Sequence, residues 1–142
     1  MKHCITLTLL LLFAAGCSGR VGVSGKVSYD DGQPVEGCSV LFRSAGENYQ
    51  GIADEKGKYQ LGSGGNTNGI RPGIYQVTVA STYNDENENT VYKVSPKYAE
   101  TGTSGLTCEV KGKTVFDIKV EHAGEAEQPP KYNRKPPRRD EN

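Results

Sequence analysis

The sequence has no tryptophan, only two histidines and few apolar residues, since hydrophobic types make up 35% of its 142 residues. It also lacks any amphipathic stretch long enough to predict a helix of several turns. Glycine and proline are frequent instead, with 18 and 7 residues. A short chain that is poor in core formers and rich in turn formers is typical of a small, single-domain β protein.

The sequence also has no excess of charge of either sign, because 17 basic residues balance 17 acidic residues. Proteins that bind nucleic acid usually carry a clear basic excess on one face. We therefore expect no nucleic acid among the partners of this protein.

Histidine is too scarce to favour enzymatic chemistry. His122 is the only histidine after residue 3, so a Ser-His-Asp or Cys-His arrangement would have to be built around it. A structural zinc site needs four ligands, and beside Cys17 only Cys38, Cys108 and His122 remain after the first 16 residues. We expect no catalytic residue, no metal and no cofactor.

One acidic stretch contains many side-chain oxygens, at residues 84–89 with the sequence NDENEN. Calcium prefers oxygen ligands, but an EF-hand loop needs a central glycine and a different spacing. The stretch predicts an exposed acidic loop, and calcium binding is the alternative.

No hydrophobic run in the sequence is long enough to cross a membrane. The longest apolar block, residues 5–15, is interrupted by Thr6 and Thr8. At ~1.5 Å per residue it covers roughly half of a ~30 Å bilayer core. Its length is instead typical of the apolar region of a secretory signal.

The apolar block ends in Ala14-Ala15-Gly16-Cys17, which resembles the bacterial lipobox, although the third residue before the cysteine is Ala14 rather than the usual leucine. The resemblance implies a signal peptide at residues 1–16, diacylglycerol on the Cys17 sulfur, and a lipidated linker at residues 17–20. Lipid on Cys17 would attach the protein to a membrane. A plain secretory signal with an incidental cysteine is the alternative.

The same resemblance implies a location in the bacterial cell envelope, facing the periplasm or the cell surface. Ser18 follows the cysteine, where an aspartate is the usual signal for retention in the inner membrane of some bacteria. Its absence favours the outer membrane.

Alternation of apolar and polar residues predicts about seven short strands. In residues 20–29, RVGVSGKVSY, the valines and Tyr29 share one parity, which predicts a strand with one buried face. Further strands are predicted at residues 38–42, 49–53, 58–61, 74–80, 106–110 and 114–121, with 91–94 as a short candidate. Turn-rich segments separate them, so we predict an antiparallel β-sandwich over residues 21–122.

Residues 123–142, AGEAEQPPKYNRKPPRRDEN, contain four prolines and nine charged residues. Such a segment cannot bury enough apolar surface to offset its ordering entropy, so it is predicted to be a disordered tail. Contact of its basic residues with anionic lipid or acidic glycan, and a purely solubilising role, are the two alternatives.

Three blocks, VSGKVSYDDGQPVEGCSVLF, ADEKGKYQL and RPGIYQVTV, occur in the order typical of carboxypeptidase regulatory-like domains. The sequence resembles this family over about residues 21–120. The resemblance implies an all-β, seven-stranded Greek-key sandwich that is transthyretin-like and related to the B-type repeats of collagen adhesins.

Such sandwiches serve as spacers, adhesin stalks and binding modules, so the fold alone does not define a function. We expect a monomeric, non-enzymatic structural or interaction module whose partner is an envelope protein or a glycan. The alternative is a carrier of a small ligand or carbohydrate, or a transthyretin-like hydrolase. That alternative would need a pocket lined by Arg71, His122 or Tyr98.

In the resembled fold the second and the penultimate strand lie in opposite sheets, which would allow a disulfide between Cys38 and Cys108. After cleavage and lipidation these are the only two thiols left, and disulfides persist in exported proteins. Both cysteines share a parity with core residues. Two separate buried thiols, each acting as a small hydrophobic residue, are the alternative.

Overall fold

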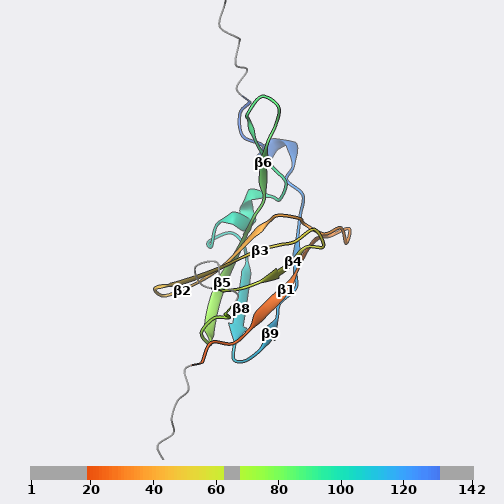
Figure 1. The fold of residues 1–142 in the computed structure, drawn as a ribbon. Coiled ribbons are helices and arrows are strands. Elements are labelled where there is room, and N and C mark those ends of the chain that lie inside the picture. Colours follow the sequence, from red (N-terminus) through yellow and green to blue (C-terminus); the bar gives the residue numbers. More distant parts are fainter. Residues whose placement is uncertain (1–18, 63–67, 132–142) are drawn as a thin grey trace, which may run out of the picture.

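Strand β1 (Val23–Tyr29) is the centre of one of two facing sheets (Figure 1). In the computed structural model, which describes residues 19–62 and 68–131, β1 pairs antiparallel with β4 (Lys58–Gln60). On its other side β1 pairs in parallel first with β9 (Thr114–Val115) and then with β10 (Ile118–Val120).

The second sheet has the strand order β3-β2-β5-β8, and all its pairings are antiparallel. Its strands are β2 (Ser39–Ser44), β3 (Glu47–Ile52), β5 (Gly73–Ala80) and β8 (Leu106–Val110). The central residue Phe42 lies opposite Tyr49 on one side and opposite Val77 on the other. An all-β fold with facing sheets is therefore present, as predicted.

A third element, a hairpin, projects beyond the two sheets (Figure 1). It consists of β6 (Thr82–Asn84) and β7 (Thr90–Tyr92). Only Ser81 separates β6 from β5, so the hairpin extends the longest strand of the sandwich. Two short 3₁₀ helices complete the described structure, η1 (Pro96–Ala99) and η2 (Glu125–Glu127).

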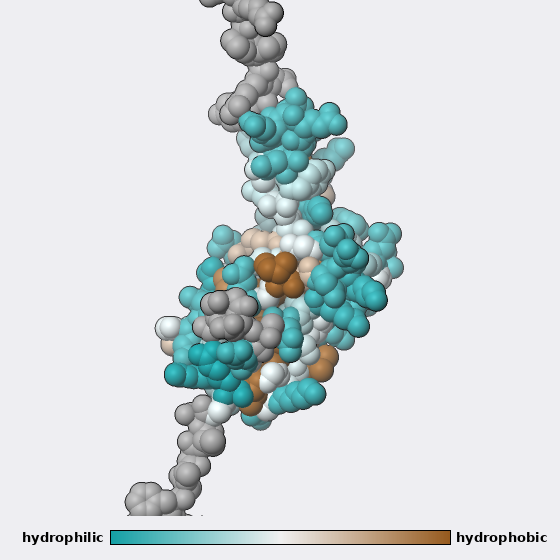
Figure 2. Space-filling view, viewed as in Figure 1, coloured by the Kyte–Doolittle hydropathy of each residue, from teal (hydrophilic) through white to brown (hydrophobic). Residues whose placement is uncertain are grey.

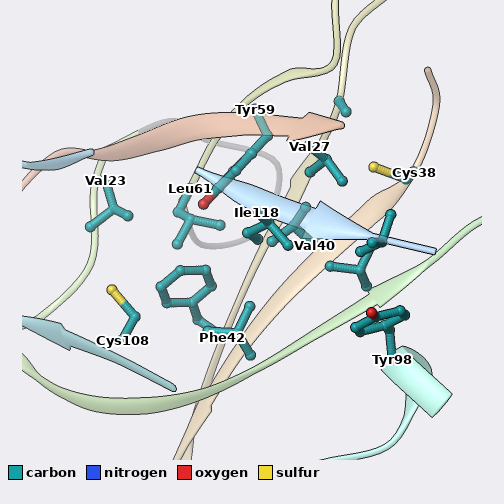
Figure 3. Close-up of a cluster of buried hydrophobic side chains, with 14 of the residues drawn as sticks. Val23, Val27, Cys38, Val40, Phe42, Tyr59, Leu61, Tyr98, Cys108 and Ile118 are labelled. Atoms are coloured by element: carbon teal, nitrogen blue, oxygen red, sulfur yellow. The ribbon is translucent and has the colours of Figure 1, made fainter. Parts of the chain in front are cut away.

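The core lies between the two sheets and consists of the faces that the alternation predicted (Figure 3). Val23 and Val27 of β1 are fully buried, as are Val40 and Phe42 of β2. Full burial of one such side chain contributes about 1.5–3 kcal/mol. These residues confirm the predicted buried faces of both strands.

The strand predicted at residues 114–121 is interrupted between β9 and β10. Here the Asp117 carboxylate replaces a main-chain acceptor, since its Oδ1 accepts the backbone N–H of Lys26 at 2.9 Å. The Phe116 carbonyl points at Gly25, where an added Cβ would lie 1.9 Å from its oxygen. Glycine at position 25 is thus required for the close approach of the two backbones.

The structure contradicts the disulfide between Cys38 and Cys108, because both cysteines are free and buried. Strands β2 and β8 belong to the same sheet, with β5 between them. Cys38 precedes Ser39, which lies opposite Ala80 of β5, whereas Cys108 lies opposite Tyr75. Five to six residues along a strand correspond to about 18 Å, far more than the ~7 Å Cα separation that a disulfide tolerates.

Figure 3 shows the same separation, with Cys38 and Cys108 on opposite sides of the labelled cluster and Phe42, Val40 and Ile118 between them. The alternative of two separate buried thiols is the one that the fold contains.

The boundary of the disordered tail also needs correction. Residues 123–131 belong to the predicted disordered tail, but they contain η2, and Gln128 and Glu127 are hydrogen-bonded to Tyr92 and Ser95. Hydrogen bonds to the hairpin, rather than apolar burial, hold this segment.

Several predictions concern residues outside the described ranges. They are the signal peptide at residues 1–16, the lipid on Cys17, and the part of the tail from residue 132 onwards. Within the described ranges, no helix has the length and apolar character needed to cross a bilayer.

Candidate interaction site at the β6–β7 hairpin

The tip of the hairpin is organised by one carboxylate. Asp85 Oδ1 accepts the backbone N–H groups of Asn87 and Asn89, both at 2.9 Å. Its Oδ2 accepts the side-chain amide of Asn89 at 3.3 Å. Short polar side chains commonly stabilise turns in this way. The hydrogen bond from the Asn89 backbone is the largest cause that lowers the pKa of Asp85, so the carboxylate stays ionised.

This arrangement gives the acidic residues 84–89 a structural role in the turn. Both carboxylate oxygens of Asp85 accept hydrogen bonds within the loop. Within residues 19–62 and 68–131, no group of three or more His, Cys, Asp and Glu side chains is placed to hold a metal ion.

An exposed aromatic ring lies on strand β6 of the hairpin. Tyr83 of β6 is 49% exposed, and the ammonium of Lys93 lies 5.6 Å from its ring centroid. A cation at this distance over an aromatic face is attracted by the ring quadrupole. Tyr83 therefore offers a partly fixed apolar face with a polar hydroxyl, a combination that is enriched at protein interfaces.

A strap formed by residues 121–128 runs along the other side of the hairpin. The side-chain amide of Gln128 contacts both main-chain groups of Tyr92: Oε1 accepts the Tyr92 N–H at 2.9 Å, and Nε2 donates to the Tyr92 carbonyl at 2.9 Å. The Gln128 side chain thus takes the place of a neighbouring strand at the edge of β7.

Glu127 fixes the strap at a second point. Its Oε1 accepts the Ser95 hydroxyl at 2.6 Å, and its Oε2 accepts the Gly124 backbone N–H at 2.8 Å. The Ser95 hydroxyl is the largest cause that lowers the pKa of Glu127, followed by the Gly124 amide. Because Ser95 itself is 2% exposed, the strap joins the hairpin to a buried part of the domain.

A cavity of about 190 Å³ lies where the hairpin leaves the sandwich. Its lining is mostly apolar and includes Val79, Val94, Tyr92, Pro96 and Ala99. Sites for drug-sized ligands are usually ~300–1,000 Å³. This cavity is therefore of a size to receive one side chain of a partner rather than a whole ligand.

The three residues named for a ligand-binding or hydrolytic pocket do not converge. Arg71 lies near the start of β1, where its guanidinium pairs with Glu47 at 2.7 Å. His122 follows β10, beside the end of β1. Tyr98 lies in η1 and is 9% exposed, with the Lys97 ammonium 5.0 Å from its ring centroid.

His122 is held by a stacking contact. Its ring lies 3.5 Å from the Tyr29 ring at an interplanar angle of 13°, and its Nε2 is 3.6 Å from Asp31 Oδ2. Burial is the largest cause that raises the pKa of Tyr29. The imidazole therefore covers the end of the core, and no nucleophile is placed against it in these contacts.

The two cysteines are poor nucleophiles in the folded protein. Burial raises the pKa of the Cys38 thiol to about 11, and it also raises the pKa of Cys108. The thiolate is the reactive form of cysteine, so little of it exists near neutral pH.

The sequence did not predict the strap as part of the site. Its hydrogen bonds come from a glutamine and a glutamate in a proline-rich, charged segment, and Gln128 contacts a residue 36 positions away. The one local signal was Glu127 three residues after Gly124, the spacing of a capping box.

Comparison of the sequence with family models and with curated proteins found no match. Comparison of the fold with solved structures found partial likenesses. Two DUF3823 family proteins, from Parabacteroides merdae and Bacteroides ovatus, are 14% and 18% identical, with TM-scores of 0.45 and 0.43. The matches cover 74% and 71% of this chain, and 47% and 44% of those proteins.

BcpA, the major pilin subunit of Bacillus cereus, is 15% identical over 74% of this chain and 31% of its own, with a TM-score of 0.45. The chain therefore spans less than half the length of these three proteins. Because their TM-scores are all below 0.5, the functional proposal rests on the residues of this chain.

Proposed function

We propose that the protein is a lipid-anchored component of the bacterial cell envelope whose single, non-enzymatic β-sandwich acts as a structural or interaction module. The observation that carries this proposal is the apolar block that ends in Ala14-Ala15-Gly16-Cys17, four residues before the first described strand pairing at Val21. Lipid on Cys17 would anchor the chain by its N-terminus, and the outer membrane is the favoured site.

The position of the hairpin supports a role in interaction. The described chain starts at one end of the domain, and the β6–β7 hairpin projects from the other end (Figure 1). An anchor at Cys17 would leave the hairpin as the part farthest from the membrane. Figure 2 shows that hydrophilic residues cover the tip of this projection, as expected of a surface that extends into solvent.

We propose the hairpin, with Tyr83 and the cavity at its base, as the surface that contacts an envelope protein or a glycan, with the domain acting as a monomer. We also propose that residues 21–122 form a Greek-key carboxypeptidase regulatory-like domain. The three sequence blocks and the order of the strands in the two facing sheets support this assignment.

The alternative of a small-ligand carrier or hydrolase has less support. Arg71 and His122 lie near opposite ends of β1, so they do not line one pocket. No specific contact in the described residues favours that alternative over an interaction module.

Membrane fractionation of cells that express Cys17→Ser tests the anchor. We expect the wild-type protein in the membrane fraction and the variant either as an uncut precursor or in the soluble envelope fraction. Cys4→Ser is the matched control, since it removes a thiol from the same leader without touching the lipidation site. Equal membrane recovery of a processed Cys17→Ser protein would contradict the anchor.

Photo-crosslinking in intact cells tests the interaction surface. A photoreactive residue replaces Tyr83 on the hairpin or, as a control, Ile52 at the end of β3, where it is 59% exposed. We expect discrete crosslinked products from position 83 and none from position 52. The same products from both positions would contradict a specific role of the hairpin.

A further inference from the structure

Three segments that are distant in the sequence form the end of the domain that lies opposite the hairpin. Val21 and Ile70 exchange two backbone hydrogen bonds, of 2.8 and 2.9 Å. The Thr114 N–H donates to the Gly22 carbonyl at 2.9 Å, and Gly73 lies opposite Val110 in the second sheet. The start of the chain, the start of β5 and the β8–β9 turn therefore lie side by side.

This end, which we call the basic end, carries four exposed cationic side chains, Arg20, Arg71, Lys111 and Lys113. It has two acidic neighbours, Glu47 and Glu109, in a protein that has equal numbers of basic and acidic residues overall. The hairpin tip at the far end has the opposite character, with Asp85, Glu86 and Glu88.

The two acidic neighbours pair with only two of the four cationic side chains at the basic end. Arg71 pairs with Glu47 at 2.7 Å, and Lys111 pairs with Glu109 at 3.3 Å. Among the described residues Arg20 and Lys113 have no carboxylate partner, and the Arg20 guanidinium lies 6.0 Å from the ring centroid of Tyr49. Two uncompensated cations are thus left at the same end of the molecule.

The length of the linker brings this end close to the anchor. Only Ser18 and Gly19 separate Cys17 from Arg20, so even a fully extended chain places these Cα atoms no more than about 11 Å apart. That reach is similar to the Debye length of about 8 Å at physiological salt. A charge held so close to a lipid surface interacts with the headgroups.

We propose that the basic end is a docking surface for anionic phospholipid headgroups. It holds the anchored domain upright, with the β6–β7 hairpin pointing away from the membrane. This inference rests on the proposed lipid anchor and adds an orientation to it. The acidic tip strengthens the orientation, because an anionic surface repels it.

Energy transfer from a dye on the protein to an acceptor on the lipid headgroups tests the orientation. The mature lipidated protein is reconstituted into phosphatidylcholine vesicles with or without phosphatidylglycerol. The dye is attached at Gly112→Cys, between the two lysines of the β8–β9 turn, or at Asn87→Cys on the hairpin tip. An added Cβ at Gly112 meets no atom within 4 Å, and the native thiols Cys38 and Cys108 are buried.

In vesicles that contain phosphatidylglycerol we expect at least twice as much transfer from position 112 as from position 87. High salt or purely neutral vesicles should reduce this ratio towards one. Arg20→Glu combined with Lys113→Glu should do the same. The matched control is Lys56→Glu combined with Lys119→Glu, which changes the charge equally at exposed positions away from the basic end and should preserve the ratio.

Equal transfer from the two positions in anionic vesicles, or a ratio that the Arg20 and Lys113 reversals leave unchanged, would overturn the docking surface. Either result would leave the anchor intact, because the protein would still be bound to the vesicles. Absence of lipidated protein from the membrane would contradict the proposed function itself, and the orientation with it.

Discussion

The phenol oxygen of Tyr59 donates a 2.6 Å hydrogen bond to the carbonyl oxygen of Phe116. The bond joins β4 to the interruption between β9 and β10, across the central strand β1. Tyr59 is 3% exposed, and burial is the largest cause that raises its pKa well above the usual range. The hydroxyl is therefore un-ionised. It serves as a hydrogen-bond donor to the Phe116 carbonyl, at the point where the strand pairing is interrupted.

Replacing Tyr59 by phenylalanine should lower the free energy of unfolding by about 1–3 kcal/mol, the cost of leaving a buried acceptor without its donor. Urea denaturation followed by circular dichroism measures the change. Tyr83→Phe is the control, because the Tyr83 ring is half exposed on the hairpin, and it should unfold like the wild type. Equal stability of Tyr59→Phe and Tyr83→Phe would mean that the bond to Phe116 contributes nothing.

Truncation of the chain after His122 should loosen the hairpin, since it removes the Gln128 side chain from both main-chain groups of Tyr92. The loss of these hydrogen bonds, each worth about 1 kcal/mol, should lower the exchange protection of the Tyr92 amide by tenfold or more. Amide exchange measured by NMR tests this. Truncation after Lys131 keeps the strap and should leave the protection unchanged; a similar loss in both truncations would rule out the strap as its cause.

The strap should also depend on pH through Glu127, whose pKa is lowered in the folded protein by Ser95 and Gly124. A carboxylate with a lowered folded pKa contributes its full stability above its unfolded pKa, near 4.5, and loses it as the pH falls through the folded value.

Exchange protection of the Gly124 amide should therefore be constant from pH 7 to pH 5 and decrease below that range. In Glu127→Gln it should be low and independent of pH over the same range. Protection that persists unchanged at pH 2.5 in the wild type would contradict the role of the ionised carboxylate.

The mature protein should contain two free thiols. Thiol titration of the unfolded, unreduced protein should find two reactive groups per chain, Cys38 and Cys108. In the folded protein the same groups should react slowly near neutral pH, because both are buried and the pKa of Cys38 is raised to about 11. A titration that finds no reactive thiol after unfolding would mean that Cys38 and Cys108 form a disulfide.

The buried faces of the strands could be predicted because a period of two residues is a local property of the sequence. Val23 and Val27, or Val40 and Phe42, reveal their common face without any knowledge of what packs against it. The sheet to which a strand belongs is not local in this sense. Cys108 has the parity of a core residue, but only the pairing of β8 with β5 places it in the same sheet as β2, which begins directly after Cys38.

The strap was missed for a related reason. Its order comes from side-chain hydrogen bonds to Tyr92 and Ser95, whereas composition counts only the apolar area that a segment can bury. The interruption at Phe116 was missed because a glycine in a strand pattern has several meanings, and the close approach of a carbonyl to Gly25 becomes visible only in three dimensions.

The most direct test of the account is the mass of the N-terminal peptide of the protein purified from its native membrane. We predict that the peptide begins at Cys17 and carries diacylglycerol on its sulfur, with the first 16 residues removed. A peptide that begins at another residue, or one that contains an unmodified Cys17, would contradict the lipid anchor and, with it, the orientation proposed for the domain.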